Sequence, residues 1–142
     1  MSRPLAILAT LVALAAAPAA AAEPDFVVVV HPATPVASLS RAQLSSCFLK
    51  KTTRWPDSSP VRPVEPLDPR LREAFARRVH QRSAAAIAAH WNALIFSGRD
   101  LPPLEKATDA DVIDYVRTTP GAIGYVSAGA DTTGVKALPP GS

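Results

Sequence analysis

A short apolar run near the N terminus, residues 5–17 (LAILATLVALAAA), most constrains what this chain can fold into, because it sets a leader apart from the rest. The run follows Arg3, and a series of small residues ending at Ala22 precedes the first acidic residue. This order is typical of a secretory signal peptide that is cleaved near Ala22. The alternative, a membrane anchor, needs about 20 apolar residues. We therefore expect residues 1–22 to be removed and residues 23–142 to form a soluble protein in the periplasm or outside the cell, without a membrane anchor.

Removal of the leader leaves 120 of the 142 residues, which is enough for one domain with one core. The single cysteine, Cys47, excludes an internal disulfide, so an apolar core must supply the stability. The net charge of +3 suits small anions or envelope polymers. Export and the scarcity of aromatic residues argue against nucleic acid as a partner. We expect one domain over residues 23–142, with an ordered core at about residues 26–128.

Strand-like runs alternate along the chain with segments of helical periodicity. Strands are predicted at residues 26–30, 61–64, 122–126 and 134–138, and helices are predicted to begin after Ser40, Asp68, Ser83 and Thr108. Pro63 would confine the second strand to an edge or a strand end, since proline has no N–H to donate. Gly124 indicates a close backbone approach or a bulge in the third strand. The alternation predicts an α/β domain of three layers or nearly so.

The helix ends carry the clearest local signals. Ser40 and Gln43 have the spacing of a capping box. Asp68 and Pro69 are typical of an N-cap and a first helical residue, and Gly98 is typical of the residue just beyond a helix end. The apolar stripes predicted to face the core are Leu44, Cys47 and Phe48; Leu71, Phe75 and Val79; Ile87, Trp91, Leu94 and Ile95; and Val112, Tyr115 and Val116.

The side chains of Cys47 and Trp55 are also expected to be buried in the core. Cys47 is interpreted as a small buried hydrophobe rather than a reactive thiol. Trp55 lies in a polar loop, residues 50–60. We expect it in the core rather than lining a cleft, because tryptophan is highly buried on average.

The sequence has no pattern typical of an enzyme or a metal centre. His31, His80 and His90 lack the spacing of metal ligands. Neither a Gly-x-Ser-x-Gly motif nor a glycine-rich phosphate loop occurs. The aspartates at positions 109, 111 and 114 are accounted for by the start of a helix, where acidic residues are favourable. We therefore expect a non-enzymatic protein without a metal or another cofactor.

Three segments in order are similar to those of one protein family: residues 39–55 (LSRAQLSSCFLKKTTRW), 60–64 (PVRPV) and 119–126 (TPGAIGYV). They resemble the substrate-binding proteins of phosphate ABC transporters, a branch of the periplasmic binding protein superfamily. The resemblance covers residues 26–128 and implies one lobe of a type II periplasmic-binding-protein-like fold, a mixed sheet flanked by helices. Full members have two lobes that close on the ligand, so this chain is similar to a small single-lobe member. Its oligomeric state, and whether a second lobe is supplied in trans, stay open.

The segment that holds phosphate in that family differs here. Full members have serine-glycine-threonine at the start of the helix after the second strand, whereas this chain has residues 65–72 (EPLDPRLR). Only Asp68 matches the family pattern at this segment. The residues themselves still predict a reduced anion site, made of Asp68, Arg70, Leu71 and Arg72. Free N–H groups at a helix start attract anions, and arginines add charge-assisted hydrogen bonds.

Two functional interpretations follow. In the first, the chain is an exported protein that binds phosphate or another small anion for uptake or sensing. In the second, it is a non-catalytic interaction module that has lost the ligand and docks on an envelope sensor or a transporter in the membrane. The arginines around the second predicted helix, which begins after Asp68, fit either a ligand site or a solvated basic helix face: Arg70, Arg72, Arg77, Arg78 and Arg82.

Overall fold

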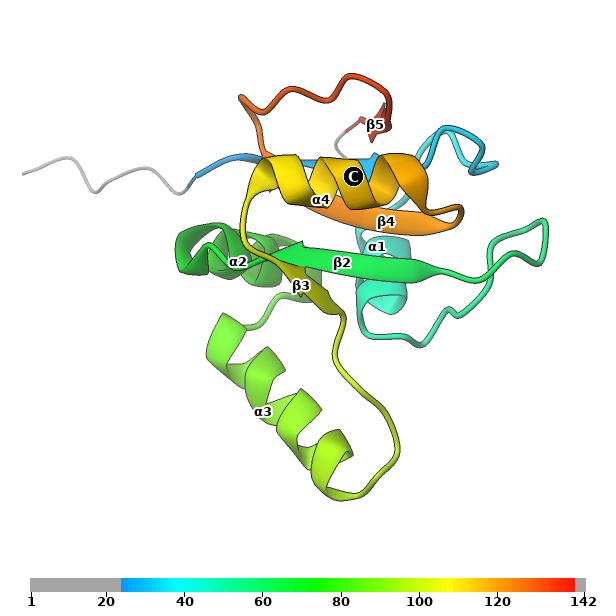
Figure 1. Ribbon diagram of the computed structural model, residues 1–142. Coiled ribbons are helices and arrows are strands. Elements are labelled where there is room, and N and C mark those ends of the chain that lie inside the picture. Colours follow the sequence, from blue (N-terminus) through cyan, green and yellow to red (C-terminus); the bar gives the residue numbers. More distant parts are fainter. Residues whose placement is uncertain (1–23, 140–142) are drawn as a thin grey trace, which may run out of the picture.

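The computed structural model describes residues 24–139, which form a five-stranded mixed sheet with helices on both faces (Figure 1). The predicted leader, its cleavage site and the last three residues lie outside the described residues. The strands are β1 (Phe26–Val30), β2 (Arg62–Pro66), β3 (Leu104–Lys106), β4 (Ala122–Ser127) and β5 (Lys136–Leu138). The helices are α1 (Arg41–Phe48), α2 (Pro69–Phe75), α3 (Ala84–Phe96) and α4 (Asp109–Thr118), with a π-helical turn, η1 (Ala76–His80), directly after α2.

The strand order is β3-β2-β4-β1-β5. Strands β2, β3 and β4 run parallel, and β1 pairs antiparallel with both β4 and β5. This mixed topology confirms the predicted α/β class. Within residues 24–139, no helix has the length and apolar character needed to cross a bilayer.

Alternation along β1 and β4 divides the interior into two cores. Val28, Val30 and Tyr125 face α1 and α2, whereas Val29 and Val126 face α4 on the other side. Because side chains along a strand point alternately to opposite faces, a sheet buried on both sides needs apolar residues at consecutive positions. The valine run of β1 meets that need, and the result is three layers, as predicted.

Local signals placed the helix starts correctly. The Ser40 hydroxyl accepts from the Gln43 N–H at 3.1 Å, and the Gln43 side chain accepts from the Ser40 N–H at 2.9 Å, which completes the capping box. The Ser83 hydroxyl caps α3 by accepting from the Ala86 N–H. Gly98 has φ +66°, the left-handed conformation expected just beyond a helix end. These predictions are confirmed. The two capping contacts could be predicted because their partners lie only three positions apart in the sequence.

The interior position of β2 rules out the edge strand that was one alternative drawn from Pro63, whereas the other alternative, a strand end, holds because Pro63 is the second residue of β2. The Arg62 N–H donates towards β4 and the Leu67 N–H towards β3, so N–H directions alternate between the two neighbours. Pro63 therefore faces β3 one residue before that pairing begins, and Pro66 faces β4 after that pairing has ended at Val64. Both prolines lie where no hydrogen bond is required, and the strand can be central.

The structure also differs from the sequence-based expectations at strand β3 and on the buried faces of α3 and α4. Strand β3 was missed because its three residues, one of them apolar, carry no periodicity. Leu94 is only partly buried and Ile95 is 45% exposed, so α3 does not bury the whole predicted stripe. In α4, Ile113 is buried, whereas Tyr115 is only partly buried. Trp55 is in the core, and its indole N–H donates to the Gly121 carbonyl at 2.9 Å.

Gly124 is explained by the close approach of neighbouring side chains to the backbone of β4, and not by a bulge. A Cβ at this position would lie 2.8 Å from Val64 Cγ1 and 2.9 Å from Val112 Cγ1. The missing side chain lets α4 pack directly against β4 and β2. The first of the two alternatives drawn from the sequence is therefore the correct one.

Candidate functional site

The carboxyl ends of β2, β3 and β4 lie at one edge of the sheet, because the three strands are parallel. Helix α2 begins directly after β2 and helix α4 begins shortly after β3, so both helix N-termini lie at this edge. In open α/β sheets, ligands bind outside the carboxyl ends of the strands. The topology therefore brings the residues predicted for a ligand site to the expected edge.

Asp68 occupies the N-cap of α2, as predicted. Its Oδ1 accepts from the Arg70 N–H at 2.9 Å and from the Leu71 N–H at 3.4 Å. These are the two backbone donors on which a bound anion was expected to depend. The carboxylate already uses them, and its negative charge opposes a second anion at the same place.

Arg72 is held inside the protein fold by two carboxylates. Its guanidinium donates to Glu65 Oε2 at 3.0 Å and to Glu105 Oε1 at 3.1 Å. Glu65 and Glu105 are register partners on the parallel strands β2 and β3, so without Arg72 two negative charges would lie side by side. The two strands and α2 are therefore joined by this ion-pair cluster.

The Glu65 side chain is the buried member of the cluster, with 7% of the residue exposed. Burial raises the pKa of this carboxyl, and the adjacent Arg72 charge opposes that rise. Burial and the nearby Glu65 carboxylate likewise raise the pKa of Tyr125. In the sequence, Glu65 stands only within residues 65–72, the segment that differs from the family pattern. Its pairing with Arg72 depends on a register that the sequence does not reveal.

The remaining members of the candidate set do not converge. Arg70 is exposed, and within residues 24–139 it makes no ion pair. Leu71 is buried in the core, so it offers only its backbone N–H. Arg77 pairs with Glu73 at 2.6 Å, and Arg78 with an aspartate just before β1. The paired arginines of this region therefore belong to separate ion pairs, and Arg70 belongs to none of those between described residues.

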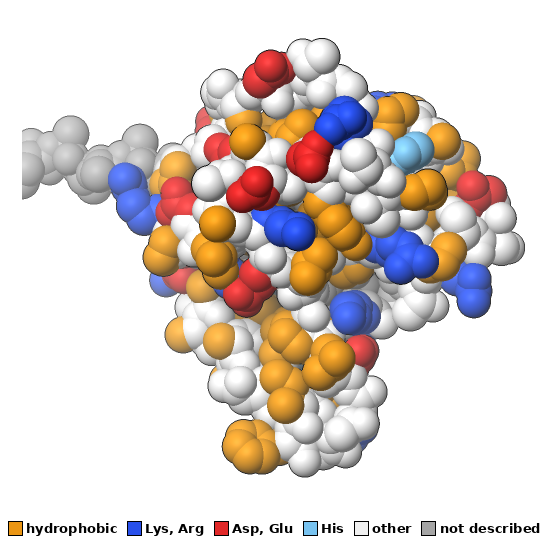
Figure 2. Space-filling view, in the orientation of Figure 1, with side chains coloured by type: hydrophobic (Ala, Val, Ile, Leu, Met, Phe, Trp, Pro, Cys, Tyr) orange, Lys and Arg blue, Asp and Glu red, His pale blue; other side chains and the backbone are white. Residues whose placement is uncertain are grey.

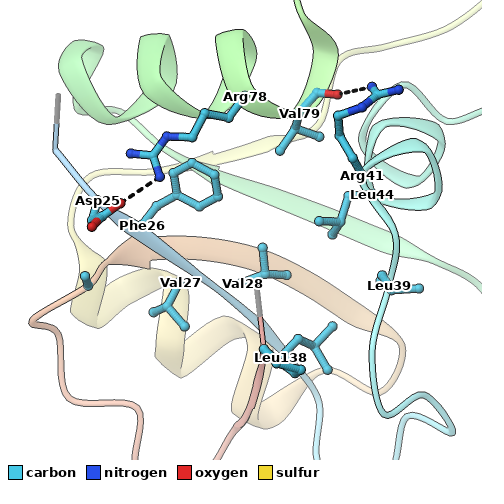
Figure 3. A pocket seen from close by; sticks show the side chains of 12 residues that line it. Asp25, Phe26, Val27, Val28, Leu39, Arg41, Leu44, Arg78, Val79 and Leu138 are labelled. Atoms are coloured by element: carbon cyan, nitrogen blue, oxygen red, sulfur yellow. Dashed lines mark hydrogen bonds and ion pairs between the residues drawn. The ribbon is translucent and has the colours of Figure 1, made fainter. Parts of the chain in front are cut away.

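Two hollows lie near these elements. A cavity of about 290 Å³ has an apolar floor from β1, α1 and β5, and Arg78 and Arg41 lie on opposite sides of it (Figure 3). Arg78 is bound to Asp25 and Arg41 to the Val79 carbonyl. A groove of about 500 Å³ lies between α2 and α3, with the Glu65 and Arg72 pair at its wall. Of the four candidate residues, only Arg72 lines either hollow.

Buried thiol chemistry does not contribute to the site. Cys47 is 2% exposed, and burial raises the pKa of its thiol to about 11. Among residues 24–139, no group of three or more histidine, cysteine or acidic side chains is arranged to hold a metal ion.

Comparison with known proteins identifies the fold. A PBP superfamily domain profile matches residues 18–137. No curated protein sequence matches the chain. Among solved structures, a protein from Clostridium perfringens, assigned as a phosphate ABC transporter substrate-binding protein and containing bound phosphate, is similar at 19% identity with a TM-score of 0.61. An ABC-type phosphate transport receptor from Vibrio cholerae is similar at 19% identity with a TM-score of 0.54.

The aligned regions define how much of the fold is present. Both alignments cover 81% of this chain, but only 44% and 45% of the two solved chains. The chain thus spans less than half the length of these relatives. The mixed five-stranded sheet with its flanking helices corresponds to part of a larger binding protein. We conclude that the chain belongs to the periplasmic binding protein (PBP) superfamily and has the fold of one portion of a phosphate ABC transporter substrate-binding protein.

Proposed function

We propose that this chain is an exported, non-enzymatic solute-binding-type protein that serves phosphate uptake or sensing in the periplasm. The observation that carries the proposal is the fold shared with phosphate-binding relatives over 81% of the chain. The apolar leader supports export, with cleavage near Ala22 and a single domain over residues 23–142. The ligand of this proposal is a small anion such as phosphate, held at the start of α2.

The geometry limits how tightly such an anion binds. Arg70 is the exposed cation at the start of α2, while Asp68 and Arg72 are engaged within the protein. Hydrogen bonds to a charged group contribute about 1.5–3 kcal/mol each. Association alone costs at least about 4 kcal/mol. We therefore expect an affinity near the millimolar range for the chain by itself, which corresponds to about 4 kcal/mol.

A second function is favoured by a specific observation at the same place. Because the Asp68 carboxylate uses both backbone donors and Arg72 is paired with Glu65, the start of α2 is filled by the chain's own groups. This arrangement supports an interaction module that has kept the scaffold, lost the anion and docks on an envelope membrane protein.

Calorimetric titration separates the two functions. The chain from Glu23 to Ser142 contains every described residue and is titrated with phosphate, with sulfate as the selectivity control. Phosphate-selective heat at about millimolar concentration supports the anion-binding proposal. Absence of heat up to about 10 mM contradicts it and supports the interaction module.

Three variants locate the site. Arg70→Glu is expected to abolish phosphate binding, and Asp68→Asn is expected to strengthen it, because asparagine still caps the helix without the negative charge. Asp57→Asn is the matched control, since Asp57 also accepts from a local backbone N–H and lies in the loop before β2. Arg72→Glu is a poor probe, because it would place a third carboxylate beside Glu65 and Glu105. Binding that survives Arg70→Glu would place the site elsewhere.

Export is tested separately. The full chain is expressed in a Gram-negative host, and the periplasmic fraction is analysed by intact mass. A species that begins at Glu23 supports cleavage near Ala22, whereas an unprocessed, membrane-associated chain contradicts it.

A further inference from the structure

The cavity beside α1 has a floor that belongs to the main core of the protein. Its volume is about 290 Å³, and it lies on the face of the sheet that α1 and α2 cover. Five of the side chains that line it are buried members of one core cluster, with 3–7% of each residue exposed: Val28, Leu39, Leu44, Val79 and Leu138. The floor is therefore formed by the fold itself, as in most small-molecule sites.

The volume of the cavity limits what it can hold. An apolar cavity of about 150 Å³ takes one benzene molecule. A cavity of about 290 Å³ therefore takes roughly ten to twelve non-hydrogen atoms. In such sites the apolar lining receives the body of the ligand, and a few polar groups decide its orientation and end group.

On one side of the cavity the charge of Arg78 is neutralised within the chain. Its guanidinium pairs with the Asp25 carboxylate at 2.6 Å and donates to the Pro24 carbonyl at 3.2 Å. The same group lies over the Phe26 ring, 4.9 Å from its centroid (Figure 3). A ligand therefore meets a paired charge on this side.

On the opposite side Arg41 keeps an uncompensated positive charge (Figure 3). Arg41 is the first residue of α1 and is partly buried, and its Nη1 donates to the Val79 carbonyl at 2.8 Å. It forms no ion pair with a described residue. The guanidinium has further N–H donors in a planar fork that matches a carboxylate. The charged side chains that line the cavity are Asp25, Arg41 and Arg78, so their net charge is positive by one unit.

The groove between α2 and α3 is larger, but it has no comparable unpaired charge. Hydrophobic side chains cover α3, at the lower end of the view in Figure 2. The carboxylates that line the groove are bound to arginines of the chain: Glu65 and Glu105 to Arg72, and Glu73 to Arg77. The smaller cavity therefore has the stronger means of selecting a ligand by charge.

We propose that the cavity beside α1 binds an amphipathic monocarboxylate, whose carboxylate pairs with Arg41 while a hydrocarbon body lies on the apolar floor. The volume fits a chain of about eight to ten carbon atoms. A single negative group is selected, because a second one on the opposite side would meet the Asp25 carboxylate. The proposal does not depend on anion binding at α2, since none of residues 68–72 lines this cavity.

Calorimetric titration with octanoate tests the proposal. The full chain is expressed with its leader, and the exported protein is purified for the titration. We expect saturable binding with a dissociation constant below about 1 mM. Acetate has the same charge without the chain, and octylammonium has the same chain with the opposite charge. Each should bind at least about tenfold more weakly than octanoate. Absence of saturable octanoate binding up to about 10 mM, or equal affinity for either control compound, would overturn the proposal.

Substitution of Arg41 tests the charged contact. Arg41→Met keeps an apolar stem without the charge and is expected to weaken octanoate binding at least about tenfold. Arg41→Lys keeps the charge and should retain most of the affinity. Arg54→Met is the matched control, because Arg54 also donates to a backbone carbonyl and lies outside the cavity. Circular dichroism checks that each variant is folded. Equal affinities for the Arg41→Met and Arg54→Met proteins would overturn the assignment of the carboxylate to Arg41.

Amide chemical shifts locate the site in the wild-type protein, without any substitution. Octanoate should shift the amide signals of Val28, Leu44 and Leu138 and leave that of Trp91 in place. Shifts confined to the start of α2, or to the groove between α2 and α3, would overturn the proposal. Phosphate added to the same sample separates this site from the proposed anion site. Phosphate should leave the Val28 and Leu138 signals in place, whether or not it shifts the signal of Arg70.

Discussion

Arg72 donates from its guanidinium to the Glu65 carboxylate at 3.0 Å, and this contact joins α2 to the central strand β2. Glu65 is almost completely buried, whereas the Arg72 side chain is 31% exposed. Loss of either side chain would therefore leave the charge of the other without its partner. A residue expected to bind an anion instead neutralises a buried carboxylate.

Replacement of Arg72 by methionine is expected to lower the free energy of unfolding by roughly 3 kcal/mol, because it leaves a buried carboxylate without its partner. The double variant Arg72→Met with Glu65→Gln should recover most of that loss, since neither charge remains. Arg77→Met is the control, because the Arg77 pair with Glu73 is exposed and should contribute less than about 1 kcal/mol. Urea denaturation provides the measurement. Equal losses for Arg72→Met and Arg77→Met would contradict the structural role of the buried pair.

His80 should make the protein less stable in acid. Burial first, and then the positive charges of Arg82, His90, Arg41 and Lys51, together lower the pKa of His80 from 6.5 to about 4. Between these two pH values the unfolded chain binds a proton that the folded chain does not, so stability falls as pH falls from 6.5 through about 4.

The variant His80→Gln removes this titration. Because His80 is only partly buried, its contribution is expected to be about 1–2 kcal/mol after screening by solvent. Urea denaturation of wild type and variant is compared at neutral pH and near pH 4. The difference between the two proteins should change with pH. A pH-independent difference for His80→Gln would rule out the expected role.

Gly121 is expected to tolerate no side chain. It has φ +81°, and a Cβ would overlap the Pro60 carbonyl oxygen. Gly121→Ala should therefore destabilise the protein by about 3 kcal/mol or more, from backbone strain and overpacking together. Gly129→Ala is the matched control, because nothing lies within 4 Å of a Cβ there. Thermal denaturation of both variants gives the comparison, and a stable Gly121→Ala would show that the turn before β4 is placed incorrectly.

Cys47 should be unreactive in the folded protein. Its thiol is buried, and its pKa of about 11 leaves little thiolate near neutral pH. We expect iodoacetamide to label Cys47 at least about 100-fold more slowly in buffer than in concentrated urea, as thiolate content and exposure determine reactivity. Mass spectrometry over time measures both rates. Rapid labelling of the folded chain would contradict burial of α1 against the sheet.

Much of the local structure could be predicted from the sequence. The capping box at Ser40, the N-cap at Asp68 and the helix end at Gly98 are present as predicted. The residues that form each of these features lie within one helical turn of each other, so they can be recognised from neighbouring positions in the sequence. The two-sided burial of β1 could also be read from its valine run, because a strand covered on both faces needs apolar residues at every position.

The candidate site was predictable only in part. The sequence placed Asp68 at the start of a helix, and the structure brings that start to the sheet edge where ligands bind in this class of fold. The partners of Arg72 were not predictable, because Glu105 lies 33 residues away and meets Glu65 only through the parallel register of β2 and β3. The same residue types fit a ligand site and an internal ion-pair cluster.

The sequence by itself determined where the four helices begin, where α3 ends, which strand is buried on both faces and which family the chain resembles, because these depend on neighbouring residues and on pattern. Only the tertiary structure decided that β2 is central, that Arg72 neutralises Glu65 and that one face of α3 stays uncovered. Each of these depends on which distant segments pack together. Strand order, register and coverage arise from contacts between residues that are far apart in the chain, and local propensity does not specify such contacts.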